Sequence, residues 1–328
     1  MEIRAVWRQM PNGWVVLCLL ACWIALFQFL GNSTLGYVNT KSLFGWWCWI
    51  NTRGTIRADG SVDIGQVLSQ DEAYGWFIPA VVLCLLWYRR EELAALPMRV
   101  SWVGLGLLGL AALLHVSGFM IQQTRLSVAG FVVGIYALTG LMWGGAWMKA
   151  TLFPFSLLGF CIPLYAAGEV LTFPLRVFAT HITSSVCQLL LGINVIRNGT
   201  QLLDPGGAYH YEVAAACSGI RSLTAILAFA VVFGYLHFKS TWRRLATVAA
   251  AVPLAVAANV FRLTLIVLAA EAFGQKAGDY VHQSSWFSLL PYVPSIGGML
   301  LLGWWLREDR KPGPAATPLL VASAKPSP

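Results

Sequence analysis

Long apolar runs separated by short polar segments dominate the chain. They occupy residues 14–30, 75–88, 100–120, 127–147, 151–168, 214–237, 245–270 and 286–306. A helix needs about 20 predominantly apolar residues to cross a bilayer. Most runs have that length, although the run at 75–88 is short and contains Pro79. The pattern predicts an all-α integral membrane protein, a bundle of about eight transmembrane helices.

Composition and charge agree with lipid as the main solvent. Only 11% of the residues are charged, against roughly 25% in ordinary soluble domains. Segments 1–13, 89–99, 148–150, 238–244 and 307–328 hold 13 Lys and Arg among 56 residues, whereas segments 31–74, 121–126, 169–213 and 271–285 hold 7 among 110. Because basic residues favour the cytoplasmic side, we expect both termini in the cytoplasm and assign the net charge of +8 to these loops rather than to nucleic-acid binding.

Two arginines, Arg221 and Arg262, fall inside apolar runs that contain no Asp or Glu. A charge at membrane depth costs a few kcal/mol or more, so such residues usually face a polar interior and mark a functional site. Counting along straight helices places both arginines about 13 Å below the outer boundary. Cys217 lies one turn from Arg221 on the same helix face, and His282 lies in the external loop 271–285.

These residue types together have the parts of a thiol catalyst. A thiolate is a nucleophile whose pKa nearby cations lower. A histidine can take the thiol proton and later protonate a leaving amine, and an arginine can stabilise the oxyanion. We expect Asn259, one turn before Arg262, to orient that arginine, and we keep His210 as the reserve base. The seven cysteines form no CxxC pair and no zinc-like spacing, so no metal or organic cofactor is expected.

The external segment 169–213 precedes the cysteine. Apolar residues recur at helical spacing from Leu171 to Leu189, which predicts an amphipathic helix at the outer leaflet. Asn198-Gly199 between apolar residues indicates a hairpin. The Asp-Pro-Gly-Gly sequence at 204–207 predicts a further turn. A hairpin edge offers an extended substrate a place to add as a strand.

Three motifs resemble the exosortase/archaeosortase family of membrane cysteine proteases. They are "ACSGIR" at 216–221, "NVFR" at 259–262 and the histidine before the last run, His282. Segments 153–164 and 173–195 also look similar. The resemblance implies that Cys217 is the nucleophile, with Arg262 and His282 as its catalytic partners, supported by Arg221, Asn259, Ser218 and Gly219.

The resemblance also implies a function and a layout. Family members cleave the C-terminal sorting signal of exported proteins, which comprises a Pro-Glu-Pro-like (PEP-CTERM) motif, a transmembrane helix and a basic cluster. Cleavage occurs at the outer face of the cell inner membrane through a Cys thioester, and water or an exopolysaccharide or lipid amine resolves it. We expect about four N-terminal spans in 1–149 with an external loop at 31–74, a catalytic core at 150–306 and a disordered cytoplasmic tail at 307–328.

One alternative function from another class stays open. A transporter or lipid-carrier protein would use Arg221 and Arg262 to bind an anionic group within the membrane. Such a protein needs the two arginines and has no use for a thiol, so replacement of Cys217 separates the two hypotheses.

Overall fold

The computed structural model describes residues 12–31, 40–52, 73–162, 165–212, 220–284 and 292–307, with a few residues between 287 and 290. Within them the chain is helical apart from one small sheet. The elements are α2 (Gly13–Phe29), α3 (Leu43–Thr52), η1 (Ala73–Trp76), α5 (Ile78–Tyr88), α6 (Arg90–Ala94), α7 (Trp102–Met120), α8 (Thr124–Ser156), η2 (Leu157–Cys161), α9 (Tyr165–Leu190), β1 (Ile196–Asn198), β2 (Gln201–Leu203), β3 (His210–Glu212), α10 (Ile220–His237), α11 (Thr241–Phe273), α12 (Gln275–Gln283) and α14 (Tyr292–Trp305).

The helices fit a multi-pass membrane protein, as the apolar runs predict. Among the described residues, three stretches are long and apolar enough to cross a bilayer, namely Trp102–Met120, Thr124–Cys161 and Thr241–Phe273. Gly13–Phe29, Ile78–Tyr88 and Leu223–His237 are shorter apolar helices. Every predicted run overlaps a helix, so the all-α membrane class is confirmed, and the number of eight spans stays a prediction.

Helix α8 is two helices that double back at Gly144. This glycine has φ 86° and ψ −175° inside an otherwise helical run. Tyr136 before the break donates a hydrogen bond to the carbonyl of Met148 at 2.8 Å, and its ring lies 5.3 Å from that of Phe155. A straight helix would hold Tyr136 and Phe155 about 28 Å apart. The contacts therefore require a reversal, which lies at Gly144 rather than at the predicted segment 148–150.

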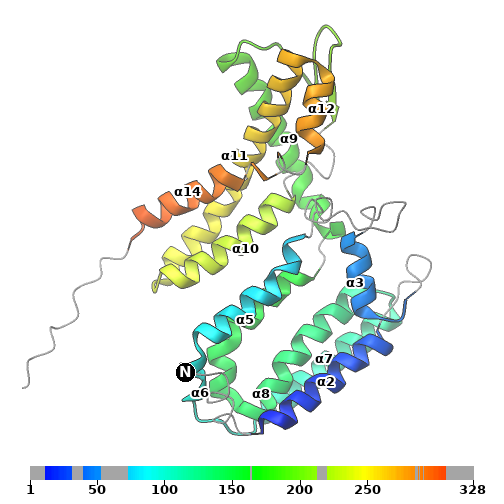
Figure 1. The fold of residues 1–328 in the computed structure, drawn as a ribbon, viewed down its shortest axis with the longest axis vertical. Helices are drawn as coiled ribbons and strands as arrows, with labels where there is room; N and C mark the ends of the chain where they lie inside the picture. The colour runs from blue at the N-terminus through cyan, green and yellow to red at the C-terminus, as the bar shows by residue number, and fades with distance from the viewer. Residues whose placement is uncertain are drawn as a thin grey trace, which may run out of the picture.

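An apolar cluster joins the N-terminal group of helices, α2 to α8, to the C-terminal group, α9 to α14. It contains Ile78, Val82 and Leu85 of α5, Leu157 of η2 and Ala228 of α10. Figure 1 shows α5 and α10 side by side between the two groups. Burial of these side chains thus fixes the C-terminal group against the N-terminal helices. The predicted boundary at 149/150 falls within the second half of α8 and stays a prediction.

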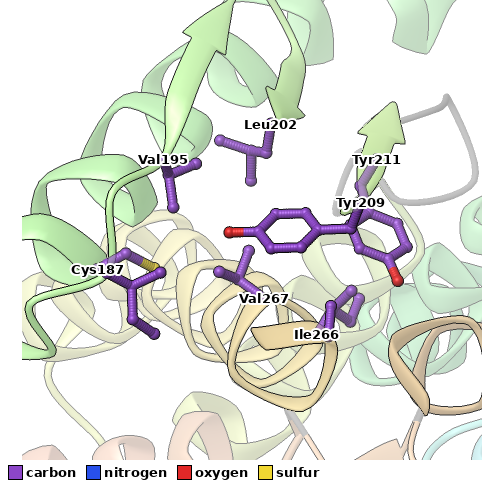
Figure 2. Close-up of a cluster of buried hydrophobic side chains, with 9 residues drawn as sticks. Cys187, Val195, Leu202, Tyr209, Tyr211, Ile266 and Val267 are labelled. Atoms are coloured by element: carbon purple, nitrogen blue, oxygen red, sulfur yellow. The ribbon is translucent and has the colours of Figure 1, made fainter. Parts of the chain in front are cut away.

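The C-terminal group contains the elements that position the site. The predicted hairpin is present as β1–β2, which pair antiparallel around Gly199, and the predicted helix lies within α9; its amphipathic position at the outer leaflet stays a prediction. A third strand, β3, which the pattern did not predict, pairs antiparallel with β2. The sheet packs onto α11 through a buried cluster. Figure 2 shows the Tyr209 ring between Val195 and Leu202 on one side and Ile266 and Val267 on the other.

The predicted external loop 271–285 is wrong in its secondary structure. Helix α11 extends to Phe273, Gly274 follows with φ 83°, and α12 begins at Gln275. His282 therefore lies on a helix rather than in a loop. Residues from 308 onward lie outside the described residues, so the disordered tail stays a prediction. Most of the predicted loop 31–74, apart from α3, also lies outside them.

Replacing Gly144 with alanine tests the reversal in α8. The φ and ψ of Gly144 are adopted almost only by glycine and cost a residue with a side chain about 1–3 kcal/mol. An added Cβ would also meet the carbonyl oxygen of Arg99. We expect Gly144→Ala to lower the free energy of unfolding in detergent by at least that amount. Gly145→Ala is the matched control, because nothing lies within 4 Å of its Cβ position; equal effects of the two variants would contradict the assignment.

Candidate functional site

Arg262 links α11 to the C-terminal end of α12. Its Nη2 donates a hydrogen bond to the backbone carbonyl oxygen of His282 at 3.2 Å. That carbonyl belongs to the last turn of α12, where carbonyls have no intrahelical partner. The C-terminal end of a helix also carries a partial negative charge. The guanidinium therefore satisfies an orphan carbonyl and lies where a positive charge is favoured.

The reversal at Gly274 brings His282 to the depth of Arg262. α12 folds back along α11, and Val281 packs against the cluster that contains Ile266, Val267 and Ala270 of α11. Arg262 lies about 16 Å before the end of α11, and the returning helix covers most of that distance. A loop histidine at the outer boundary would remain far from Arg262, whereas a helix folded back places it within contact.

The His282 imidazole is half-buried in an environment that keeps it neutral. Burial lowers its pKa from the ordinary 6.5, and the positive charge of Arg262 lowers it further. Asp279, one turn earlier on α12, acts in the opposite direction. Burial and the arginine together outweigh the carboxylate, so the imidazole is neutral near pH 7 and can accept a proton.

Tyr211 of β3 fixes the other side of α12. Its hydroxyl donates a hydrogen bond to the carbonyl of Gln275 at 2.9 Å, and its ring centroid lies 6.5 Å from that of His282. Burial, then the charge of Asp279 and a hydrogen bond to it, raise the pKa of Tyr211 to about 12. The phenol therefore stays protonated and remains a donor. Gly278 is required at this contact, because a Cβ there would meet the Tyr211 hydroxyl.

Asn259 lies one turn before Arg262 and is 5% exposed. It lines a cavity of about 10 Å³ together with Leu175 and Ala179 of α9 and Leu223 of α10. Residues at i and i+3 share a helix face, so α9 and the beginning of α10 pack close to the level of Arg262. A direct bond between Asn259 and Arg262 stays a prediction.

The structure brings two of the predicted catalytic residues, Arg262 and His282, together. Cys217, Ser218 and Gly219 lie outside the described residues. Arg221 is in the first turn of α10, and its side chain is outside the described part of the chain. His210, the reserve base, is on β3 opposite Leu203 and is exposed.

Sequence reasoning missed Tyr211 and Asp279. Asp279 had a usable signal, since it precedes His282 by one helical turn, but only if 275–283 is read as a helix. Tyr211 had none, because its contact with α12 arises from the pairing of β3 with β2. The assembled group can hold a neutral imidazole beside a fixed cation, the electrostatic conditions that nucleophilic catalysis by a thiol needs.

Comparison with known proteins identifies the family. Residues 65–317 match the family model described as transmembrane exosortase (Exosortase_EpsH). Curated proteins and solved structures give no match. The matched segment begins well before residue 150, so it is wider than the part of the chain that carries the three motifs. Because it covers most of the sequence, the chain belongs to the transmembrane exosortase family.

Proposed function

We propose that the protein is a membrane cysteine peptidase or transpeptidase that cleaves the C-terminal sorting signal of exported proteins. The signal class comprises a PEP-CTERM-like motif, a transmembrane helix and a basic cluster. Cleavage proceeds through a thioester on Cys217 at the outer face of the cell inner membrane. Family membership supports the class of enzyme, and the geometry at Arg262 and His282 supports the assignment of roles.

The two elements that flank segment 213–219 carry the proposal. β3 ends at Glu212 and is bound to α12 through Tyr211. α10 begins at Ile220, and its Leu223 lines the cavity that contains Asn259. Cys217 is three residues from Ile220, a separation of at most about 11 Å by chain length alone. Both anchors of the segment thus pack against the elements that hold Arg262 and His282, which supports a site shared by thiol, imidazole and guanidinium.

In the proposed reaction His282 accepts the proton of the Cys217 thiol. The thiolate attacks the scissile carbonyl carbon, and Arg262 stabilises the oxyanion of the tetrahedral intermediate. The protonated imidazole then donates its proton to the leaving amine, which leaves an acyl thioester on Cys217. Water or an acceptor amine resolves the thioester. We assign Arg221, Asn259, Ser218 and Gly219 to support of this centre.

The charge distribution along α11 supports an external site. Arg243 and Arg244 lie near its beginning, and Arg262 lies about 27 Å further along the axis. The first two belong to the basic segments that we assign to the cytoplasm. Arg262 and His282 then face the periplasm, the compartment in which exported substrates present their sorting signals.

Removal of the thiol tests the proposal against an anion carrier. We expect Cys217→Ala to reduce cleavage of a co-expressed substrate carrying the sorting signal by at least about a thousandfold, because no nucleophile remains. Mass spectrometry of the substrate's C-terminus is the measurement. Cys84→Ala is the control, since Cys84 is an exposed cysteine on α5. Full processing by Cys217→Ala would contradict the enzyme and favour the carrier.

The pH dependence of alkylation tests whether Arg262 activates the thiol. A cation close to a thiol favours the thiolate. We therefore expect Arg262→Gln to move the midpoint of Cys217 alkylation by iodoacetamide to higher pH, and Arg262→Lys to move it less. Arg243→Gln, on the same helix and remote from the site, is the control. An unchanged midpoint in Arg262→Gln would contradict activation of the thiol by the arginine.

Replacing Asp279 tests His282 as the base, because the direction of the resulting pKa change can be predicted. The carboxylate raises the pKa of His282 against the larger effects of burial and Arg262. Its removal in Asp279→Asn should lower that pKa further, so the acidic limb of the kcat/KM profile should move to lower pH. An NMR titration of His282 should move in the same direction. Lys276→Gln, an exposed change on α12, should leave both unchanged; a shift to higher pH in Asp279→Asn would contradict the assignment.

A further inference from the structure

A second, larger cavity, with a mainly apolar lining that includes basic residues, lies at the opposite end of the bundle from Arg262. It has a volume of about 570 Å³ and lies between the end of α5, the second half of α8 and α10. Its lining combines two cations, Arg89 and Lys149, with Tyr235, Phe153, Leu152 and Ser156. No residue of the proposed catalytic centre takes part in it.

The cavity is rigid on one side and exposed on the other. Arg89 Nη1 donates hydrogen bonds to the carbonyl of Ala150 at 2.6 Å and to the hydroxyl of Tyr235 at 2.9 Å. The Tyr235 ring stacks on Phe153 with centroids 3.6 Å apart. Lys149 is exposed, and among the described residues it has no ion pair within 4 Å. A fixed guanidinium and an available ammonium therefore face one cavity.

The surrounding charge is positive. Arg244 lies over the Tyr235 ring, with its guanidinium carbon 5.1 Å from the ring centroid. Glu92 pairs with Arg89, and Glu91 lies 3.7 Å from Arg90. Each of these two carboxylates is thus matched by an arginine, so Lys149 and Arg244 provide an excess of positive charge. This balance favours an anionic ligand.

Aromatic side chains place the cavity at the level of lipid headgroups. Trp87 and Tyr88, which precede Arg89, are 44% and 77% exposed, and Trp242 before Arg243 is 58% exposed. Exposed Trp and Tyr next to basic residues are typical of the membrane interface. Leu152, at 56% exposure, gives the cavity an apolar edge beside the acyl-chain region. The ligand must therefore combine an anionic group with an attached hydrocarbon.

We propose that this cavity binds the headgroup of an anionic phospholipid from the leaflet at the basic end of the bundle. The phosphate binds Lys149, the cation of the lining that no carboxylate of the described residues matches, and its acyl chains run along Leu152 and Phe153. The site joins α5 and α8 of the N-terminal group to α10 of the C-terminal group, so an occupied cavity connects the two groups at this end.

Titration of a short-chain phosphatidylglycerol into the detergent-solubilised full chain, read by native mass spectrometry, tests the proposal. We expect binding that phosphatidylcholine does not reproduce. Lys149→Gln should weaken it about fivefold, the effect of one basic residue near an anionic surface. Arg99→Gln is the matched control, because Arg99 is an exposed basic residue outside the cavity lining, and it should leave the affinity unchanged.

Three outcomes would overturn the proposal. Equal weakening by Lys149→Gln and Arg99→Gln would indicate general surface attraction without a site. Equal binding of phosphatidylcholine would remove the anionic requirement. Displacement of phosphatidylglycerol by an equal concentration of inorganic phosphate would identify a site for the free anion rather than for a lipid. Lys149 is exposed, so its replacement should leave the thermal unfolding midpoint in phosphatidylcholine nanodiscs unchanged.

Discussion

A guanidinium held within a largely apolar helix bundle is the constraint on which the C-terminal group of helices depends. Such a charge is costly unless polar groups surround it, and the backbone of a regular helix offers few acceptors, because its carbonyls are already bonded. The end of a helix is an exception. Arg262 reaches the carbonyl of His282 at the end of α12, and α12 reaches that depth only because the chain reverses at Gly274. The arginine and the reversed helix thus require one another.

The same contact also affects the imidazole. Burial lowers the pKa of the His282 ring most, and the positive charge of Arg262, bound to the His282 carbonyl, lowers it further. Asp279 limits the decrease and also interacts with Tyr211, which binds α12 to β3. A single short helix therefore carries the imidazole that we propose as the base, the carboxylate that raises its pKa and the carbonyl that binds the cation. Small displacements of α12 would change all three.

The apolar pattern predicted the elements that face lipid, because burial in hydrocarbon depends directly on composition. Asn198-Gly199 also predicted the hairpin correctly, since a tight turn depends on local residues. The pattern did not predict α12. Its sequence is polar and contains Gly278, so local propensity favoured a loop, and the helix is held by contacts from Arg262 and Tyr211. For a related reason, the reversal in α8 lies at Gly144 and not at the predicted segment 148–150. Apolar residues continue on both sides of Gly144, and only the backbone angles of this glycine mark the break.

Two arginines of α11, Arg244 and Arg262, are stabilised in the same way. Arg244, near its beginning, donates from Nε to the carbonyl of Phe238 at 2.7 Å, directly after the end of α10. Arg262, further along, donates to the carbonyl at the end of α12. Cations at a helix beginning are disfavoured by the helix dipole by about 0.3–1 kcal/mol, so Arg244 gains from the opposite dipole of α10. Each arginine of this pair is therefore stabilised by the C-terminal end of a neighbouring helix, and the positions of those helix ends determine where a membrane-embedded α11 can carry positive charge.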